Sequence, residues 1–319
     1  MTAPRPLYFD CDLGVDDAMA LLYLLASPEV DLVGIGTICG NTDAAQVTEN
    51  VLRFLDLAGR PDIPVAAGED RYLAAEYGRR PTWVHGENGI GNVDLPATVL
   101  AATGESPADM ILRLSHEYEG DLEILAVGPF TNLALALAAD PSLPSRVKAV
   151  TVMGGAALVP GNVTAVAEAN IIHDPEAAAR VLEATWPVTL VGLDVTMENL
   201  LEEADLARLA ASDSPTVRAV ARMHEVYFDY HVEEFGRRCC ALHDPLAAAI
   251  AVGTIAPVDS PWVDVVVDDT RGPGRGQTIA DLRGYRLGAR DVEDATNRMV
   301  LKTDRPFAAH LLERVLGRE

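Results

Sequence analysis

Residues 7–21 read Leu7-Tyr8-Phe9-Asp10-Cys11-Asp12-Leu13-Gly14-Val15-Asp16-Asp17-Ala18-Met19-Ala20-Leu21, which sets four carboxylates within eight positions, between an apolar run and the apolar start of a helix. Like charges this close repel one another, and burial raises the pKa of each carboxyl group. A bound divalent cation would offset both effects, because hard cations take oxygen ligands from several Asp side chains at once. The stretch therefore predicts a buried strand whose carboxyl end carries a metal site.

Short apolar runs alternate with helical stretches along most of the chain. This alternation is typical of βαβ units and predicts an α/β fold with an open, mostly parallel sheet and helices on both faces. The predicted strands are 7–9, 30–37, 122–127, 147–153 and 188–191, and the predicted helices are 16–26, 41–58, 131–139, 174–184 and 304–316. After about residue 255 the pattern changes to a few extra, shorter strands, at 263–267, 278–281 and 298–302.

Nothing in the sequence divides the chain into separate domains. There is no long Pro-, Gly- or Ser-rich linker, no internal repeat and no low-complexity block, so we expect a single domain over residues 1–319. Two stretches, 77–96 and 222–243, are predicted to be surface loops over a site, with the first part of the second stretch helical.

The composition excludes several classes of partner. The chain has 25 Lys and Arg against 48 Asp and Glu, a formal net charge of −23, and this disfavours nucleic acid and acidic membranes, which bind through basic residues. No apolar stretch approaches the roughly 20 residues of a membrane span, and no secretory signal opens the chain. The four cysteines lack zinc-type spacing. We therefore expect a cytoplasmic protein with buried, reduced thiols.

Polar residues follow nearly every predicted strand. In open parallel sheets, ligands bind beyond the carboxyl ends of the strands, so these residues are expected to converge. They are Asp10, Asp12, Asp16 and Asp17 after the first strand, Asn41 after the second, Thr131 and Asn132 after the third, and Asn162, Glu168 and Asn170 after the fourth, with His243 and Asp244 before a later helix. Such a set suits a small polar ligand with several hydroxyl groups.

Some of these residues have simpler interpretations. Asp16 and Asp17 are also typical of a helix start, where the dipole favours negative charge. Asp244 before Pro245 is equally typical of a helix N-cap followed by Pro at the first position, and residues 173–175 repeat the same His-Asp-Pro tripeptide. Asn41 and Asn162 both follow Gly and could be turn residues. Glu168, Asn170 and His85 could lie on solvated loops.

In their order along the chain, these segments resemble the nucleoside hydrolase family of the inosine-uridine preferring type. Residues 10–18 match the family pattern D-x-D-x-G-x-D-D-A, and the resemblance extends over nearly the full chain. Leu13 stands where Pro is common, and Ala169 where a bulkier residue is common. The other matching segments are Gly40-Asn41, Gly128-Pro129-Phe130-Thr131-Asn132, Gly161-Asn162-Val163-Thr164, Ala167-Glu168-Ala169-Asn170 and His243-Asp244-Pro245.

The resemblance implies a Rossmann-like, single-domain α/β fold, a homodimer or homotetramer, and hydrolysis of the N-glycosidic bond of ribonucleosides to free base and ribose. It implies a Ca²⁺ ion held by Asp12, Asp17, Asp244 and the backbone carbonyl of Thr131. Asp12 would also be the general base on a metal-bound water, and Asp10 would orient the cluster. An oxygen-rich, anionic pocket suits the oxocarbenium-like state of this reaction.

The resemblance also implies roles around the sugar and the leaving base. His243 would face the base as a possible acid, because a His with a pKa near neutrality can donate a proton. His85 would lie on a mobile loop near the 5′ end of the sugar. The ribose hydroxyls would be bound by Asp16, Asn162, Glu168 and Asn170, with Asn41 near the water and the sugar. By position alone, the candidates for the base pocket are Met153, Tyr227, Tyr230, His231 and Arg237.

The aromatic residues near position 230 have two interpretations. Tyr227, Tyr230 and His231 lie three or four positions apart, so a helix would present them on one face. That face could contact the leaving base, but a core aromatic stripe explains Tyr227 and Tyr230 equally well.

Two other functions fit parts of the pattern. A phosphatase of the haloacid dehalogenase type also places two Asp residues after its first strand and uses Mg²⁺, but that motif usually has Thr or Val where this chain has Gly14, and the only lysines, Lys148 and Lys302, lie outside the motifs. A non-catalytic, calcium-dependent ribonucleoside-binding protein would need neither Asp12 as base nor His243 as acid. The sequence therefore favours a Ca²⁺-dependent ribonucleoside N-ribohydrolase.

Overall fold

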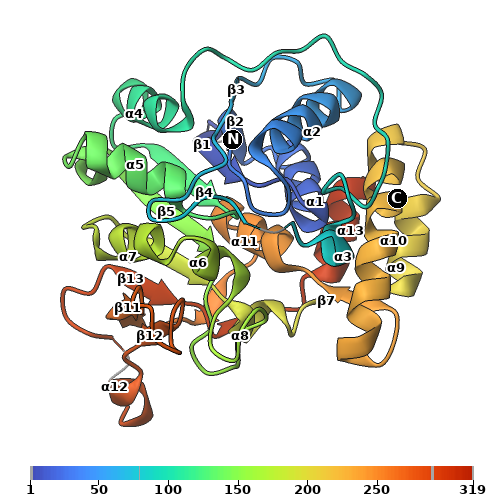
Figure 1. Cartoon of the computed structure of the whole chain (residues 1–319). Helices are drawn as coiled ribbons and strands as arrows, with labels where there is room; N and C mark the ends of the chain where they lie inside the picture. Colours follow the sequence, from blue (N-terminus) through green and yellow to red (C-terminus); the bar gives the residue numbers. More distant parts are fainter. Residues whose placement is uncertain (1–2, 79, 289–290, 318–319) are drawn as a thin grey trace.

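An eight-stranded sheet runs through the computed structural model, which describes residues 3–78, 80–288 and 291–317 (Figure 1). All neighbouring strands are parallel except the edge strand β10, which pairs antiparallel with β13, so the prediction of a mostly parallel sheet is confirmed. The strands in spatial order are β10 (Trp262–Val263), β13 (Asn297–Met299), β6 (Val188–Val191), β5 (Val147–Met153), β4 (Leu122–Ala126), β1 (Arg5–Cys11), β2 (Val30–Thr37) and β3 (Val65–Ala66).

Strand β1 lies in the middle of the sheet and is covered on both faces. Its side chains alternate, with Leu7 and Phe9 in one hydrophobic cluster and Tyr8 in the other. All three are completely buried. A parallel strand that is buried on both faces has a nearly continuous apolar sequence, and this explains the apolar run at residues 7–9.

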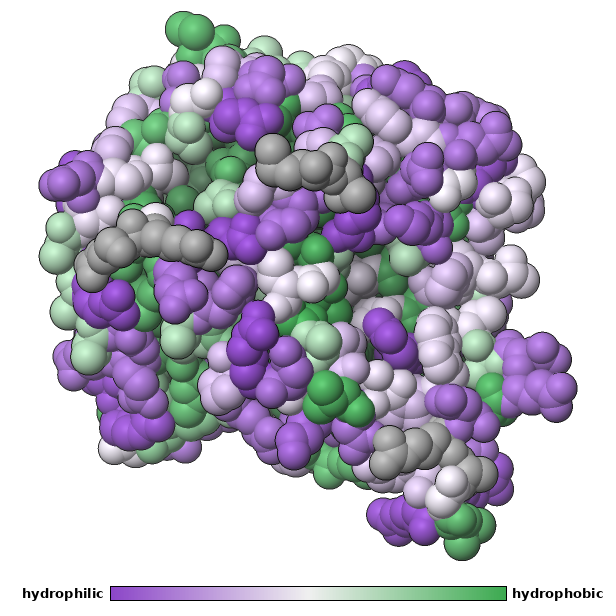
Figure 2. Space-filling model, turned by 180° about the vertical axis from the view of Figure 1, so that it is seen from behind, coloured by the Kyte–Doolittle hydropathy of each residue, from purple (hydrophilic) through white to green (hydrophobic). Residues whose placement is uncertain are grey.

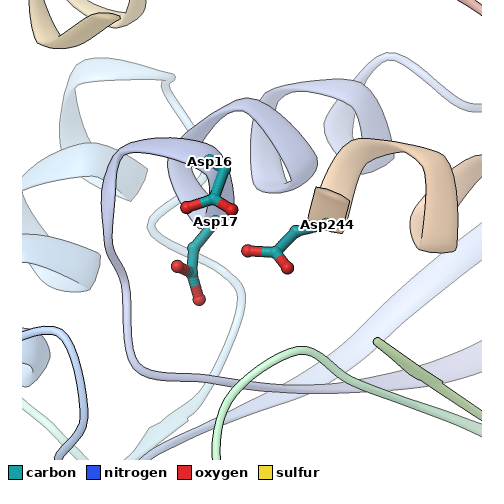
Figure 3. Close-up of side chains that lie close together, drawn as sticks. All are labelled: Asp16, Asp17 and Asp244. Atoms are coloured by element: carbon teal, nitrogen blue, oxygen red, sulfur yellow. The ribbon is translucent and has the colours of Figure 1, made fainter. Parts of the chain in front are cut away.

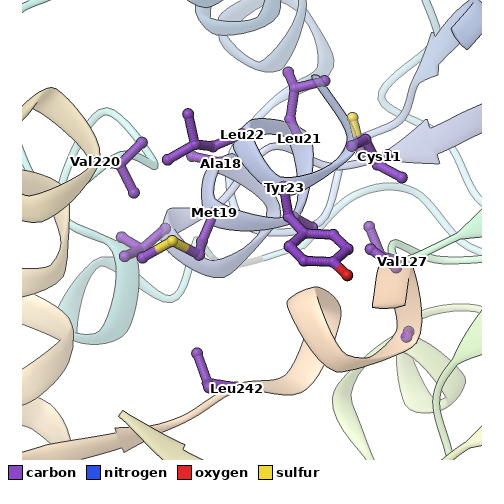
Figure 4. Packing of buried hydrophobic residues seen from close by; sticks show 14 of the residues in the cluster. Cys11, Ala18, Met19, Leu21, Leu22, Tyr23, Val127, Val220 and Leu242 are labelled. Atoms are coloured by element: carbon purple, nitrogen blue, oxygen red, sulfur yellow. The ribbon is translucent and has the colours of Figure 1, made fainter. Parts of the chain in front are cut away.

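Helices cover both faces, as predicted. On the Phe9 side, the strands pack against α1 (Val15–Leu25), α2 (Ala44–Leu57) and α11 (His243–Val252), and α10 (Pro215–Phe235) and α13 (Ala308–Leu316) pack in turn against α1. The Tyr8 face packs against α4 (Pro107–Glu117), α5 (Thr131–Ala139) and α7 (Pro175–Glu183). Helix α1 is buried on nearly all sides, with Met19 and Leu21 among its core residues (Figure 4). A helix that is apolar all round belongs inside a protein, and this burial fixes the position of its first turn.

The order of the strands creates a crevice between β1 and β4. The chain proceeds from β1 outward to β2 and β3, then returns to β4 on the other side of β1. At such a switch point, the loops after the two central strands separate and leave room for a ligand. The loop after β1 carries Asp12, and the loop after β4 carries residues 128–130 and leads into Thr131.

The shorter elements lie mainly around the edges of the sheet. Among the described residues, they include three two-stranded antiparallel pairs, β11 with β12, β14 with β9 and β7 with β8. The extra C-terminal strands that we expected are therefore present. The bounds are α3 (Thr82–His85), η1 (Leu143–Ser145), α6 (Ala169–His173), α8 (Leu193–Thr196), β7 (Leu200–Glu202), α9 (Glu203–Ala210), β8 (Cys239–Ala241), β9 (Pro257–Asp259), β11 (Val265–Val267), β12 (Thr278–Ala280), α12 (Arg283–Arg286) and β14 (Lys302–Thr303).

Several predicted boundaries were wrong. The first part of residues 222–243 is helical as expected, but little of a surface loop follows, because α10 continues to Phe235 and β8 begins at Cys239. The stretch 77–96 contains helix α3, and the predicted strands at 263–267 and 298–302 are each divided in two. The helix predicted from residue 41 begins at Ala44, because the side chain of Asp43 caps it by accepting from Gln46 N–H. The last helix begins at Ala308 and not at 304.

The surface agrees with the composition. Figure 2 shows hydrophilic residues spread over the face opposite to that of Figure 1, with smaller hydrophobic areas between them. Across the described residues, we find no helix with the length and apolar character that crossing a bilayer requires. All four cysteines are buried and free of disulfide bonds, as expected.

Candidate active site

A cavity of about 440 Å³ opens at the carboxyl ends of the central strands. Its floor includes Val127 and Met153, which stand at the ends of β4 and β5, and its rim includes residues of α3 and α10. Most of the residues singled out from the sequence line this one cavity. They are Asp16, Asn41, His85, Met153, Asn162, Glu168, Asn170, Tyr227, Tyr230, His231, His243 and Asp244.

Other predicted residues lie outside the cavity wall. Asp10, Asp12, Asp17 and Thr131 lie deeper, and each is at most 1% exposed. Arg237 belongs to a different place: it forms an ion pair with Glu202 on the exposed surface, so its assignment to the base pocket was wrong.

Three carboxylates meet beside the cavity. One oxygen each of Asp16, Asp17 and Asp244 lies within 4.8 Å of the other two (Figure 3). Asp16 and Asp17 belong to the first turn of α1, and Asp244 belongs to the first turn of α11. The two helices pack against each other, which brings together carboxylates more than 220 positions apart in the sequence.

Asp12 lies next to this group, in contact with Asp17. Its backbone N–H donates to Asp17 Oδ1 at 3.2 Å, and its Oδ2 accepts from Asn41 N–H at 2.8 Å. Its Oδ1 is buried and has no hydrogen-bond partner. A buried carboxylate oxygen without a donor is costly, and such an atom indicates a missing ligand. Gly40 is required here, because a Cβ at this position would overlap Asp12 Oδ2.

Burial and mutual repulsion raise the pKa values of this cluster. Burial raises the pKa of Asp16 to about 7, with a further contribution from Asp17. Burial is also the largest cause of the raised pKa values of Asp12, Asp17 and Asp244, and neighbouring carboxylates add to the shifts of Asp12 and Asp244. In the described part of the chain, the cavity wall contains no Lys or Arg. The cluster is therefore an oxygen-only set that lacks positive charge, and it fits a hard divalent cation.

The simpler interpretations hold for some residues only. Asp17 does stabilise the start of α1, since its Oδ2 accepts from Gly14 N–H at 2.7 Å. Asp244 is not an N-cap, because α11 begins at His243 and the capping position is Leu242. Glu168 and Asn170 do not lie on a solvated loop, because they are 2% and 7% exposed.

The amide and carboxylate groups on the far side of the cavity are held by the backbone. Glu168 caps α6 and accepts from the N–H groups of Asn170, Ile171 and Gly155 at 2.9–3.2 Å. Asn170 Nδ2 donates to the carbonyl groups of Val127 and Met153, which end two strands of the sheet. These bonds fix both side chains at the cavity wall before a ligand arrives. Burial raises the pKa of Glu168 to about 7.

Asn162 and Asp10 are held in the same manner. Asn162 Oδ1 accepts from Ala169 N–H at 3.1 Å. Asp10 accepts from the Tyr8 hydroxyl at 2.7 Å and from Asn132 Nδ2, which also donates to the Thr37 carbonyl. Asp10 thus connects the end of β1 to the neighbouring strand β2 and to helix α5.

The imidazole groups of the site are neutral at pH 7. Burial lowers the pKa of His85 to about 3, and its Nδ1 accepts from Val15 N–H at 3.2 Å. Burial, together with His231, lowers the pKa of His243 to about 3, whereas we expected a value near neutrality. His243 Nδ1 lies 2.8 Å from Thr196 Oγ1. This bond orients the ring.

Aromatic rings form the wall above the carboxylates. The Tyr227 hydroxyl donates to Asp16 Oδ2 at 3.3 Å, and the Tyr227 ring lies 5.6 Å from that of His85 and 4.4 Å from that of His231. Tyr227 therefore lines the cavity and also belongs to the core, and its contact with the leaving base stays a prediction. Tyr230 is 38% exposed, which a core residue would not be.

Nine residues of the cavity wall were not singled out from the sequence as site residues. These are Pro81, Trp83, Val84, Val127, Val163, Ala169, His173, Met197 and Glu234. His173 ends the helix that begins just after Glu168, so its spacing of three from Asn170 was an available signal. The sequence offered no comparable signal for Met197, which follows the short helix α8.

Known proteins resemble this chain over most of its length. The family model described as inosine-uridine preferring nucleoside hydrolase matches residues 7–308. Uridine nucleosidase 1 of Arabidopsis thaliana is 38% identical over 77% of this chain and 73% of that protein. The inosine-uridine preferring nucleoside hydrolase of Crithidia fasciculata is 36% identical over 89% and 90% of the two chains.

A solved structure gives the same result. The plant nucleoside hydrolase named PpNRh1 superposes with a TM-score of 0.91 at 32% identity, over 98% of this chain and 99% of that one. The fold, the converging site residues and these matches agree. The chain therefore belongs to the inosine-uridine preferring nucleoside hydrolase family and is a nucleoside N-ribohydrolase.

Proposed function

We propose that this enzyme hydrolyses ribonucleosides to free base and ribose with the help of Ca²⁺. The observation that carries the proposal is the buried carboxylate cluster with an unpartnered Asp12 oxygen and, in the described chain, no Lys or Arg in the cavity wall. A phosphatase would need cations to bind phosphate, so the same observation speaks against that alternative.

The residues proposed to hold the ion are Asp12, Asp17, Asp244 and the backbone carbonyl of Thr131. They supply only oxygen atoms, and together with water and two ribose hydroxyls they would give the high coordination number that Ca²⁺ accepts and Mg²⁺ does not. When bound, the ion would supply positive charge to the carboxylate cluster and Lewis acidity at the site.

Asp12 is proposed as the general base that takes a proton from the attacking water. Its Oδ2 is held by Asn41 N–H, which leaves the buried Oδ1 as the atom available for this proton. Asn41 Nδ2 donates to Asp17 Oδ2 at 3.1 Å, so this side chain also orients the neighbouring carboxylate. A base that is fixed before the substrate binds needs little reorganisation during the reaction.

The sugar is proposed to lie between Asp16 on one wall and Asn162, Glu168 and Asn170 on the other. Tyr227 fixes Asp16, and backbone groups fix the other three. Carboxylates at fixed positions stabilise the positive charge that develops on the sugar as the N-glycosidic bond breaks. Hydrogen bonds to the ribose hydroxyls would make ribonucleosides better substrates than 2′-deoxyribonucleosides.

The leaving base is proposed to lie against the aromatic wall, near Met153, Tyr227 and His231, with His243 as its proton donor and His85 near the 5′ end of the sugar. Because His243 is neutral in this structure, it would need to gain its proton when the charge around it changes on binding. The relatives named above act on uridine or inosine by their names, so we propose both pyrimidine and purine ribonucleosides as test substrates.

We further propose that residues 1–319 form one domain and that the protein is a cytoplasmic homodimer or homotetramer without nucleic acid or membrane partners. The family model spans residues 7–308 without division, which supports the single domain.

Removal of the metal ion tests the proposal directly. Thorough chelation should reduce the release of reducing sugar from uridine and inosine by at least about 10³-fold, and added Ca²⁺ should restore it. Mg²⁺ at the same concentration serves as the control and should restore much less. Undiminished hydrolysis by protein that elemental analysis shows to be metal-free would contradict the metal requirement.

The variant Asp12→Asn tests the base. It should lower kcat by about 10²- to 10⁴-fold, because an amide cannot accept the proton of the water. Circular dichroism should show an unchanged fold. A kcat within about threefold of the wild type would exclude Asp12 as the base.

A further inference from the structure

One segment of the cavity wall is held from outside the site. The sugar loop, which we define as residues 154–168, leaves the end of β5, carries Asn162 and ends at Glu168. Its first residues are connected to Glu168 directly, because Gly155 N–H donates to Glu168 Oε2 at 3.0 Å. The position of Gly155 therefore affects where the Glu168 carboxylate points.

Two side chains that do not line the cavity hold the start of the sugar loop. The Thr278 hydroxyl accepts from Ala156 N–H and donates to the carbonyl of the same residue, both at 2.9 Å. The Asp194 carboxylate accepts from the N–H groups of Ala157 and Leu158 at 2.8 and 2.7 Å. Thr278 is 3% exposed and Asp194 is 8% exposed, so both side chains are buried, and the two bonds of Thr278 are shielded from water.

Backbone contacts from the same two elements complete the arrangement. Leu193 N–H, from helix α8, donates to the Gly155 carbonyl at 2.8 Å. Gln277, which precedes β12, forms an antiparallel bridge with Ala167 at the other end of the sugar loop. Adjacent residues 277 and 278 thus hold both ends of the loop.

The conformation of Gly155 makes this support necessary. Gly155 has a φ of +83°, a left-handed conformation that glycine adopts without strain. A Cβ at this position would lie 2.9 Å from Thr278 Oγ1, so the loop and β12 are in close contact. Because glycine adopts positive and negative φ values about equally well, the local sequence does not fix this conformation. The neighbouring hydrogen bonds must do so.

We propose that Thr278 and Asp194 are positioning residues for ribose binding. They hold residues 155–158 so that Gly155 N–H orients the Glu168 carboxylate toward the sugar. This inference rests on the proposed role of Glu168 in binding ribose. It also assigns a function to the C-terminal hairpin β11–β12, which lies outside the main sheet.

The test uses the full-length enzyme with Ca²⁺ and uridine. Thr278→Val keeps the shape of the side chain and removes both hydrogen bonds, so KM should rise about 10-fold while kcat changes less than about threefold. Thr278→Ser keeps the hydroxyl and should restore KM to within about threefold of the wild type. Titration with Ca²⁺ should give an unchanged affinity in each variant, because the proposed ligands are untouched.

A matched control separates positioning from general destabilisation. Thr216, at the start of α10, is also buried and does not line the cavity. Its hydroxyl donates to the carbonyl of Leu57, at the end of α2. Thr216→Val should therefore lower stability to a similar extent and leave KM unchanged. If Thr278→Val does not fold, Asp194→Asn removes one acceptor only and should raise KM in the same direction.

A double-mutant cycle gives the decisive result. In the Glu168→Gln background, Thr278→Val should have little further effect on KM, because both changes disturb the same contact with the sugar. Full additivity of the two effects, a wild-type KM in Thr278→Val, or a parallel loss of Ca²⁺ affinity would overturn the inference. If the wild type itself hydrolyses no ribonucleoside, the proposed function fails, and that result is visible before any variant is compared.

Discussion

The tripeptide His-Asp-Pro occurs near the start of two helices of this protein, and its Asp has a different environment in each. In residues 173–175 the Asp lies before helix α7 and caps it, with Asp174 Oδ1 accepting from Ala177 N–H at 3.0 Å. Its Oδ2 accepts from Leu73 N–H and from the Thr131 hydroxyl. Asp174 is completely buried and has three donors. It is a structural residue.

In residues 243–245 the same three amino acids lie two positions deeper in the helix. Helix α11 begins at His243, so Asp244 is inside its first turn and cannot cap it. Its side chain meets the carboxylates of Asp16 and Asp17 (Figure 3). The different helix register thus separates a carboxylate that accepts three hydrogen bonds from one that faces two other carboxylates.

The two His residues differ as well. His173 Nδ1 is buried without a hydrogen-bond partner, and its ring stacks on that of Tyr72 at 5.8 Å. His243 Nδ1 is paired with Thr196, and its ring lies 6.5 Å from that of His231. Both line the cavity, so the contrast can be tested on matched pairs of variants.

Asp244→Asn should have the largest effect on activity. Removing one proposed ligand of the ion should lower kcat/KM by at least about 10³-fold and weaken Ca²⁺ binding strongly. In the presence of a chelator, the same variant should be as stable as the wild type or more stable, because one of several repelling carboxylates is gone. Steady-state kinetics, calorimetric Ca²⁺ titration and thermal unfolding measure these three quantities.

Asp174→Asn is the matched control and should behave in the opposite way. It leaves one of the three donors without an acceptor, which should lower stability by about 1–3 kcal/mol. Its Ca²⁺ affinity should stay within about threefold of the wild type. The comparison fails if Asp174→Asn loses Ca²⁺ binding as Asp244→Asn does.

The central part of the fold could be predicted from the sequence, because local patterns determine it. The apolar run that becomes β1 and the adjacent helix start place Asp12, Asp16 and Asp17 together within a few residues, so no long-range information was needed. The strands at 30–37, 147–153 and 188–191 and the helix at 131–139 have the predicted bounds.

The wall formed by α10 could not be predicted as well. Its signals were present in the sequence: Ser214 caps the helix, Pro215 begins it, and Gly236 ends it with a φ of +67°. We expected only the first part of this stretch to be helical, because the full length and the buried face of the helix depend on its packing against α9, α1 and α3. The role of Asp244 likewise depended on the helix register, which the tripeptide does not determine.

His243→Ala should have an intermediate effect that depends on the leaving group. If His243 donates a proton to the base, the loss in kcat should be about 10- to 100-fold for inosine and much smaller for a nitrophenyl riboside, whose leaving group needs no proton. His173→Ala should change both substrates equally and by less than about fivefold. Equal losses on both substrates in His243→Ala would leave stacking by the aromatic wall as the means of base departure.

The smallest expected effect is a dependence of stability on pH close to 7. Burial raises the pKa values of Asp10, Asp16 and Glu168 to about 7, well above those of an unfolded chain. The folded state therefore binds more protons than the unfolded state, and the stability that this gives is lost as pH rises through 7. The buried His residues have lowered pKa values and act in the opposite direction, but only below the pKa of an unfolded His, about 6.5.

Just above pH 7 the carboxylates should therefore dominate. In chelator, Tm should fall by about 2 °C between pH 7 and 8 and then level off, because these groups have by then lost their protons. The rise in Tm on adding Ca²⁺ should be larger at pH 8.5 than at pH 7, because deprotonated carboxylates bind the ion better. Asp244→Asn should reduce this slope, since it removes one member of the cluster, and Asp174→Asn should leave the slope unchanged. A Tm in chelator that rises from pH 7 to 9 would contradict the proposal that the folded state buries these carboxylates and raises their pKa values.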